Sequence, residues 1–260
     1  MKKVTIQGSL RIFTGGMGGG KTHTTLTETN DRKHKLREKI LVIQPRVSVR
    51  ESIDGNGETK ARSHVAAESR LIPYDNPFEA LDLARENKVN LVAIVDSHMF
   101  ISGPIAAVVY GLLNAGKDVN LDCLEFDYGG EIFPVLQDLI HAANSISYHY
   151  RQCDCQKPGD EPIGRYNQLI INTPIKKKKE LLEKLKSKPE RDQKLIYLVE
   201  HGTIDLKTGL ILPAYFGATN VTGDIAKDLN TNNIVSDEVS YITRCRKCFV
   251  KPRDLRKYLK

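Results

Sequence analysis

A glycine-rich run near the start of the chain has the composition of a phosphate-binding loop. Residues 15–22 read GGMGGGKT and fit the pattern G-x-x-x-x-G-K-[ST]. Glycines let successive backbone N–H groups turn toward phosphate oxygens, and a following helix adds the positive end of its dipole. We expect Lys21 to reach the β- and γ-phosphates of a nucleotide and the Thr22 hydroxyl to ligate Mg²⁺. The alternative is a glycine-rich turn beside an incidental lysine. The residues of the predicted loop are Gly15, Gly16, Met17, Gly18, Gly19, Gly20, Lys21 and Thr22.

A phosphate-binding loop works with an acid on a neighbouring strand, which holds the metal ion. Residues 91–95 read LVAIV, a continuous apolar run typical of a buried parallel strand, and Asp96 follows directly. Asp96 is therefore the candidate metal-side acid. The alternative is an acid that only caps the end of its strand.

Four of the five cysteines form two close pairs, Cys153 with Cys155 and Cys245 with Cys248. Four thiolates suit a tetrahedral structural Zn²⁺ site, and the C-x-x-C spacing of the second pair is usual for zinc ligands. The C-x-C spacing of the first pair is tighter than usual, so unpaired structural cysteines are the alternative. Cys123 lies in a predicted strand and is most simply a core residue.

Short apolar runs alternate with helical patterns over the first 145 residues or so, which predicts βαβ units. Such units form a parallel sheet with flanking helices, and ligands bind at the carboxyl ends of its strands. We therefore predict an α/β fold of the P-loop type. The predicted strands are 10–14, 39–43, 90–96 and 119–124, and the predicted helices are 22–39, 78–88 and 105–114.

The alternation of strands and helices ends at about residue 150, and the sequence beyond it is more basic. Four lysines, 176–179, open a charged helical stretch that reaches roughly residue 188, and strands are predicted at 195–199 and 210–212. The formal net charge of +7 comes from this half, because residues 1–150 hold 17 basic and 18 acidic side chains and the rest hold 22 and 14. A solvated helix face explains the lysine run most simply. Nucleic-acid binding is the alternative, and it would depend steeply on salt.

Composition excludes several classes of protein. With 40% hydrophobic residues in 260, the chain can bury a full core. No apolar run approaches the roughly 18 residues of a membrane span, and the first residues, MKKV, lack the apolar stretch of a signal peptide. An odd number of cysteines without an export signal argues against a disulfide framework, so we expect a cytoplasmic protein.

Together these stretches resemble the thymidine kinase family of the two-domain type, in particular its bacterial members. Residues 8–22 are similar to the family's G-S-L…G-P-M-F-S-G-K-S, and residues 124–133, LEFDYGGEIF, resemble L-D-M-D-F-R-G-E-P-F, the lid over the thymine pocket. Residues 240–248, SYITRCRKC, resemble S-Y-E-A-R-C-R-K-C, the lasso tyrosine and second zinc pair. Arg50, followed by the Ser-His pair at 63–64, matches the family's R-Y-S and S-H.

The resemblance implies an ATP-dependent kinase that phosphorylates the 5′-hydroxyl of thymidine or a related nucleoside, as a homotetramer. It implies an ATP-binding domain over residues 1–148, a zinc-binding lasso domain over 149–252 and a basic tail over 253–260. The lasso carries an insertion at about 160–230 for which the resemblance gives no account. By the same resemblance Arg50 belongs to the catalytic site, and the candidate substrate-binding residues are Phe100, Phe126, Tyr128 and Tyr241.

The chain departs from the family at the catalytic stretch I-D-E-x-Q-F, which here reads VDSHMF over residues 95–100. Asp96 is retained, but Ser97 stands where the family has its glutamate base, and a serine does not usefully accept a proton near neutral pH. Loss of a general base typically costs about 10²- to 10⁴-fold in rate, which predicts a slow kinase. A catalytically retired nucleotide-binding or regulatory protein is the alternative. The candidate substitute bases are His98 and the lid acids Asp127 and Glu131, although a structural histidine and an ordinary lid role for Glu131 are the simpler interpretations.

Overall fold

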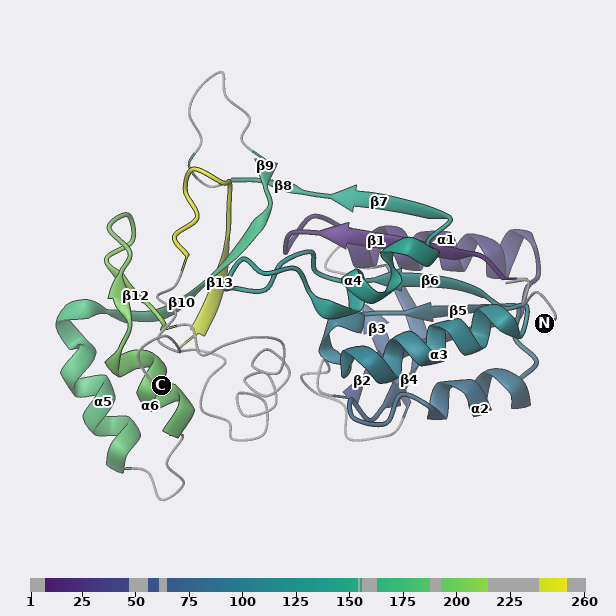
Figure 1. Ribbon diagram of the computed structural model, residues 1–260, viewed down its shortest axis with the longest axis horizontal. Helices are drawn as coiled ribbons and strands as arrows, with labels where there is room; N and C mark the ends of the chain where they lie inside the picture. The colour runs from purple at the N-terminus through teal and green to yellow at the C-terminus, as the bar shows by residue number, and fades with distance from the viewer. Residues whose placement is uncertain are drawn as a thin grey trace. The chain divides into compact units, whose positions relative to one another are not determined.

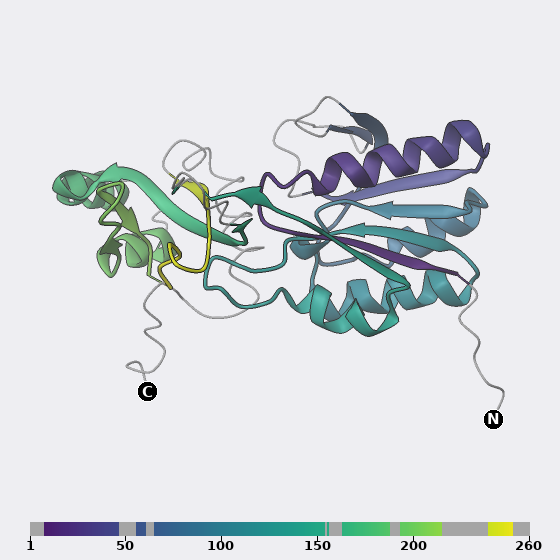
Figure 2. The same ribbon diagram turned by 90° about the horizontal axis from the view of Figure 1, so that it is seen from above.

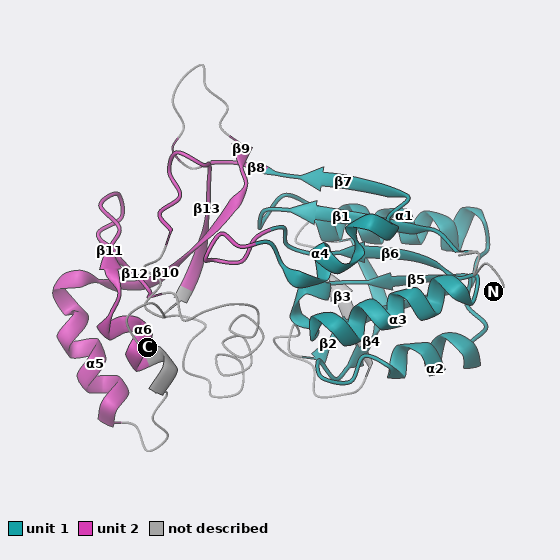
Figure 3. Ribbon diagram, in the orientation of Figure 1, with its two compact units in different colours: residues 1–125, 132–150 teal, residues 126–131, 151–260 magenta. Residues whose placement is uncertain are grey.

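The computed structural model describes residues 8–46, 56–60, 65–153, 155, 163–187, 193–214 and 239–251. The chain divides into two compact units (Figure 3). The first unit consists of residues 1–125 and 132–150, and the second of residues 126–131 and 151–260. The stretch that resembles the family lid therefore groups with the second unit, although it lies within the sequence of the first.

The first unit is built on a seven-stranded sheet in the order β3-β4-β2-β5-β6-β1-β7 (Figure 1). All neighbouring strands are parallel except β3 and β4, which are antiparallel. The predicted α/β fold with a parallel sheet is confirmed. The strands are β1 (Leu10–Gly15), β2 (Ile40–Pro45), β3 (Asn56–Lys60), β4 (Ala66–Ile72), β5 (Leu91–Ile94), β6 (Asp118–Asp122) and β7 (Ser145–His149).

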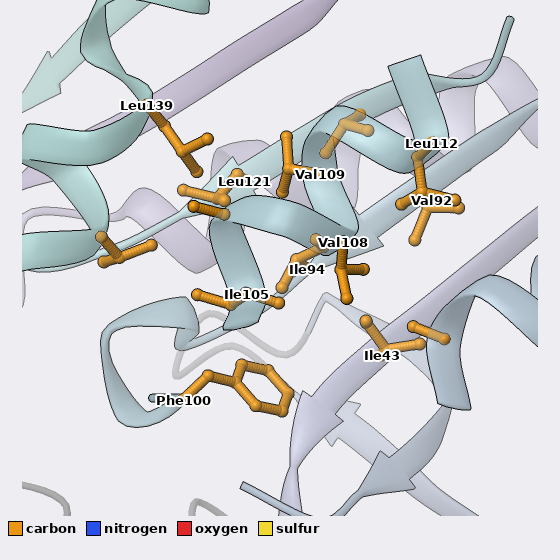
Figure 4. Close-up of a cluster of buried hydrophobic side chains, with 14 of the residues drawn as sticks. Ile43, Val92, Ile94, Phe100, Ile105, Val108, Val109, Leu112, Leu121 and Leu139 are labelled. Atoms are coloured by element: carbon orange, nitrogen blue, oxygen red, sulfur yellow. The ribbon is translucent and has the colours of Figure 1, made fainter. Parts of the chain in front are cut away.

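Helices cover both faces of this sheet, with α1 on one face and α3 and α4 on the other (Figure 2). The larger core lies on the α3 side, where α3 is apolar around most of its circumference and packs Ile105, Val109 and Leu112 among strand residues such as Ile94 and Leu121 (Figure 4). The helices are α1 (Lys21–Lys35), α2 (Glu79–Glu86), α3 (Ser102–Asn114) and α4 (Pro134–Leu139), with short 3₁₀ turns η2 (Ser97–Met99) and η3 (Ile140–Ala142).

Helix α1 reaches the sheet with few apolar residues. Leu26 is its one large buried apolar side chain, and the buried Thr25 and Thr29 lie on the same side. Their hydroxyls donate to the carbonyl oxygens one turn earlier, Lys21 at 3.0 Å and Thr25 at 2.6 Å. The polar groups are therefore satisfied within the helix, which lets α1 lie against the sheet.

The second unit has a four-stranded antiparallel sheet in the order β11-β12-β10-β13 and a short hairpin of β8 and β9. It has its own apolar core, formed by Ile171, Leu181, Leu185, Ile196, Val199 and Ile211. No helix in the described part of the chain is long and apolar enough to span a membrane. The elements are β8 (Arg151–Gln152), β9 (Ile163–Gly164), β10 (Tyr166–Pro174), η4 (Ile175–Lys177), α5 (Lys178–Ser187), α6 (Gln193–Glu200), β11 (Thr203–Ile204), β12 (Leu210–Leu212) and β13 (Val239–Arg244).

The strand predicted at 195–199 is wrong, because these residues belong to helix α6. A short apolar run has no periodicity that separates a buried strand from a buried helix. In the structure Ile196 and Val199, three positions apart, share the core with Leu181 and Leu185 of α5. The predicted helix after the lysine run and the strand at 210–212 are confirmed.

Lys178, inside the lysine run, has a structural partner. Its Nζ donates to the carbonyl oxygens of Glu200 at 2.8 Å and Gly202 at 3.3 Å, at the C-terminal end of α6. A cation at that end complements the helix dipole. The neighbouring Lys176, Lys177 and Lys179 are exposed, so most of the run is a solvated surface.

Two glycines allow strand β7 to pass directly against the glycine-rich loop. A Cβ at Gly15 would lie 2.0 Å from the carbonyl oxygen of His149, and a Cβ at Gly19 would lie 2.2 Å from the same oxygen. Gly15 also has φ of 137°, a conformation that favours glycine. Backbone contact with β7 therefore fixes the path of the loop.

Gly19→Ala is expected to lower the free energy of unfolding by about 1–3 kcal/mol, because its methyl group overpacks against the His149 carbonyl. Gly103→Ala is the matched control: beyond the adjacent residues and the backbone of its own helix, no atom lies within 4 Å of the added Cβ, and in a helix alanine is favoured over glycine by roughly 0.5–1 kcal/mol. Urea unfolding measures both. Equal stability of the two variants would contradict the close approach of β7.

Candidate functional site

The glycine-rich loop lies between β1 and α1, as a phosphate-binding loop does. Gly18 and Gly20 have φ of 73° and 92°, which only glycine adopts readily. Gly20 is the residue before α1 and has no side chain to cap the helix, and the first turn of α1 contains no acidic residue. This helix end thus has neither a side-chain cap nor an acidic first turn, as is typical of a helix N-terminus that binds an anion.

The ammonium group of Lys21 is buried beside this loop. Its Nζ donates to the carbonyl oxygen of Gly16 at 2.8 Å, and only 7% of the residue is exposed. Burial lowers the pKa of Lys21, whereas the charges of Asp122 and Asp96 raise it. The charges of two carboxylates from neighbouring strand ends thus act on the lysine.

Asp96 and Ser97 lie at the carboxyl end of β5, as predicted. Asp96 has φ of 51°, and its backbone N–H donates to Oδ1 of Asp122 at 2.6 Å. The Ser97 hydroxyl donates to the backbone carbonyl oxygen of Asp122 at 2.7 Å, and Ser97 is fully buried. Ser97 therefore acts here as a hydrogen-bond donor that joins the ends of β5 and β6.

Asp122 is the site residue that the sequence analysis missed. It ends β6, between β1 and β5 in the sheet, and is fully buried. Burial, and secondarily the charge of Asp96, raises the pKa of Asp122 to about 7, while Lys21 acts in the opposite direction. Its signal in the sequence was a single acid inside the apolar strand predicted at 119–124.

His98 is placed as a structural residue. Its ring packs edge-on against Phe133 with centroids 5.0 Å apart, and its Nδ1 accepts a long hydrogen bond, 3.4 Å, from the Leu124 N–H. Burial, together with the charge of Lys21, lowers the pKa of His98 to about 3. A group that weakly basic is a poor proton acceptor at neutral pH.

The four predicted zinc ligands come together in the second unit. The Sγ atoms of Cys153, Cys155, Cys245 and Cys248 all lie within 4.8 Å of one another, and those of Cys155 and Cys245 are 3.9 Å apart. Tetrahedral zinc with Zn–S bonds of about 2.3 Å separates its sulfurs by about 3.8 Å. The cluster could therefore hold a zinc ion. Cys123 is fully buried in the core of the first unit, as expected.

The turn between β11 and β12, which lies in the predicted insertion, supports this cysteine cluster. Lys207 Nζ lies 3.0 Å from Sγ of Cys248, and this contact lowers the pKa of the thiol to about 7. Asp205 forms a buried ion pair with Arg244, next to Cys245, at 3.2 Å. The insertion thus stabilises one thiolate and holds the end of strand β13, which directly precedes the turn with Cys245 and Cys248.

The lid stretch is held within the second unit by an aromatic stack. Phe126 stacks on Tyr166 of β10 with ring centroids 5.0 Å apart, and Tyr166 stacks on Phe249 at 4.7 Å. Arg165 lies 5.2 Å above the Phe126 ring, and Asn167 Nδ2 donates to the Phe126 carbonyl oxygen at 2.9 Å. Strand β10, also from the insertion, therefore fixes the start of the lid.

Asp127 closes the lid into a tight turn. Its Oδ1 accepts the backbone N–H groups of Gly129 at 2.8 Å and Glu131 at 2.9 Å. Burial and the charge of Asp127 raise the pKa of Tyr241, on β13, to about 12, so the two residues are close in space. Tyr128 is 1% exposed. The lid and the lasso tyrosine therefore form one packed region.

Two predicted residues stand apart from these groups. Phe100 packs in the core of the first unit with 4% of the residue exposed (Figure 4). Arg50 lies outside the described residues, as do the Ser-His pair at 63–64 and the tail at 253–260. Their predicted roles stay predictions.

Residues 8–163 match the family model described as thymidine kinase. This match covers more than half of the chain. The chain belongs to the thymidine kinase family.

Thymidine kinases from three organisms are similar to it. The protein of Coprothermobacter proteolyticus is 25% identical over 154 residues, 59% of this chain and 73% of that protein. That of the aster yellows witches'-broom phytoplasma is 28% identical over 141 residues, 54% and 64% of the two chains. That of Thermococcus kodakarensis is 27% identical over 176 residues, 67% and 85%. At the level of its family, the chain is a thymidine kinase-like nucleoside kinase, and this family uses ATP.

Lys207→Ala is expected to weaken zinc binding about tenfold, because the variant loses a hydrogen bond to a ligand thiolate. The control is Lys179→Ala, which removes an exposed lysine of the same unit and should leave the affinity unchanged. Competition with a chromogenic chelator measures both. Identical affinities in the two variants would contradict the supporting role of Lys207.

His98→Gln is expected to flatten the pH dependence of stability in acid. Because the pKa of His98 falls to about 3 on folding, protonation favours the unfolded state. The histidine therefore costs the wild type stability as the pH falls below about 6.5, by at most about 1.4 kcal/mol per pH unit. Urea unfolding at pH 7.5 and 4.5 gives the difference. Parallel losses in wild type and variant would show that His98 is not buried as a neutral ring.

Proposed function

We propose that this chain transfers the γ-phosphoryl group of ATP to the 5′-hydroxyl of thymidine or a related nucleoside. The observation that carries this proposal is the buried Lys21 ammonium in a phosphate-type loop, next to the carboxylates of Asp96 and Asp122. Phosphoryl transfer draws most of its acceleration from positioning and from cations that neutralise the moving charge. The loop and its lysine supply both without a side chain that reacts covalently.

The residues beside the loop fit a magnesium ion. Asp96, Asp122 and the Thr22 hydroxyl offer hard oxygen donors. The Asp96 N–H contacts the Asp122 carboxylate, and the nearby Thr22 hydroxyl lowers the pKa of Asp122, so the three groups are close together. Mg²⁺ in kinase sites is held by one or two carboxylates together with phosphates and waters. When bound, it would neutralise the charge that develops on the transferred phosphoryl group.

Neither Ser97 nor His98 is suited to act as the general base that removes the proton from the nucleoside hydroxyl. The Ser97 hydroxyl already donates to Asp122, and the ring of His98 is weakly basic. A rate lower by about 10²- to 10⁴-fold than with a general base is the expected consequence. The proposed enzyme is therefore slow, with positioning and charge neutralisation intact.

The nucleoside base would be recognised by the lid and the lasso tyrosine, by resemblance to the family. The packed region of Tyr128, Asp127 and Tyr241 in the second unit supports this assignment. Zinc on the four cysteines would have a structural role, since four thiolates leave no open coordination position. A homotetramer remains the expectation that the resemblance carries.

A catalytically retired nucleotide-binding protein is the second candidate function. It is favoured by the burial of Ser97 and by the hydrogen bond that occupies its hydroxyl. Such a protein would bind ATP through the loop and would not turn over.

An assay of ADP release with zinc-loaded protein distinguishes the two functions. Thymidine and the other deoxynucleosides are tested in turn, and slow, nucleoside-dependent ADP release is expected for at least one of them. Lys21→Met is expected to reduce this rate by about 10²-fold or more, because phosphoryl transfer depends on its charge. The absence of turnover with every nucleoside, in protein that binds ATP, would reject the kinase and favour the retired form.

A further inference from the structure

Asp122 is a fully buried carboxylate whose orientation is fixed. One oxygen, Oδ1, accepts the Asp96 N–H at 2.6 Å, and the residue's backbone carbonyl accepts the Ser97 hydroxyl. Strand pairing sets Asp122 opposite Phe13 of β1, two residues before the phosphate loop begins. The carboxylate is therefore held between the loop strand and the strand that ends in Asp96.

The second oxygen of Asp122 is chemically unsatisfied. Oδ2 is buried and has no hydrogen-bond partner among the described residues. The ammonium group of Lys21 in the loop donates a hydrogen bond to the Gly16 carbonyl oxygen and none to Oδ2 of Asp122. A buried carboxylate oxygen without a donor is unfavourable, and a site that retains one has a use for a cation there.

We propose that Asp122 supplies the second carboxylate of the metal–nucleotide site, with Asp96 as the first, and that it holds the metal ion directly or through one of its waters. This inference rests on the proposed function. Asp122 would then contribute a second acid to the site of this chain, in which residue 97 is a serine.

Ser97 and Asp122 are in direct contact, so the residue at one position limits what the other can be. The serine is small, fully buried and bonded to the Asp122 backbone, so a longer acid at position 97 would bring a third carboxylate next to Asp96 and Asp122. Like charges this close in a buried site raise one another's cost of ionisation. The serine at 97 and the acid at 122 are therefore compatible, and an acid at both positions is not.

The test is the affinity for Mn²⁺ in the presence of ATP, measured by electron paramagnetic resonance, which needs no turnover. Asp122→Asn keeps an oxygen that can accept the Asp96 N–H and removes the charge. It is expected to weaken Mn²⁺ binding by about 10- to 100-fold. ATP affinity measured in EDTA should stay the same or rise, because a negative charge near the phosphates is gone.

Asp118→Asn is the matched control on the same strand. Asp118 begins β6, and its partners are Ser9 and Arg32, at the opposite end of the strand from the loop. The variant loses an ion pair of its own but should bind Mn²⁺ as the wild type does. Unchanged Mn²⁺ affinity in Asp122→Asn would overturn the inference.

A double variant keeps the test decisive if Asp122→Asn is poorly folded. Ser97→Glu alone should lower the Tm, since it adds a buried acid next to the buried Asp122 and the half-buried Asp96. Ser97→Glu combined with Asp122→Asn should regain both Tm and Mn²⁺ affinity relative to the single variants. Additive losses in the double variant would show that the two positions do not share one role.

The outcomes separate the inference from the proposed function. Wild-type protein that binds Mn²⁺ with ATP but phosphorylates no nucleoside would reject the kinase and retain the role of Asp122. Turnover by the wild type, with Mn²⁺ affinity unaffected in Asp122→Asn, would reject Asp122 alone. Failure of the wild type to bind Mn²⁺ with ATP would reject both.

Discussion

The burial of charge at the edge where β1, β5 and β6 end is the constraint on which the rest of the first unit depends. Lys21 and Asp122 are buried there beside the half-buried Asp96, and buried charges are tolerated only when opposite charges and hydrogen bonds compensate them. The Asp96 N–H and the Ser97 hydroxyl provide part of that compensation. The large apolar core beneath the sheet keeps the strand ends in register, so these short bonds persist.

The second unit brings together two pairs of cysteines that lie about 90 residues apart in the sequence. It does so with a sheet in which β10 pairs with β13 over six residues and with an apolar core of its own. The inserted segment is integral to this unit: its turn carries Lys207 to Cys248, and its strand β10 carries the ring that holds Phe126. An insertion with these contacts supports both the metal cluster and the lid.

These two sites explain how the chain combines a family assignment with an altered catalytic stretch. The predicted phosphate loop follows β1 and Asp96 follows β5 in the same sheet, and the Ser97 hydroxyl is part of the hydrogen-bond network between β5 and β6. The acid that completes the buried cluster comes from the neighbouring strand. A change at one position of such a cluster alters the charge that its neighbours can carry, because all of them share one poorly hydrated site.

Local sequence predicted the glycine-rich loop between a strand and a helix, the parallel sheet and the cysteine pairs, because each depends on residue type at short spacing. Glycines with a lysine and threonine, apolar runs that end in an acid, and close cysteine pairs all act over a few positions. The apolar run at 195–199 has no such short-range signal, and only packing against α5 makes it helical. The role of Asp122 could likewise not be predicted from local sequence. Its position beside Asp96 and Lys21 follows from strand order, and strand order is decided by the tertiary fold, since it depends on which strands, distant in sequence, bury their faces side by side.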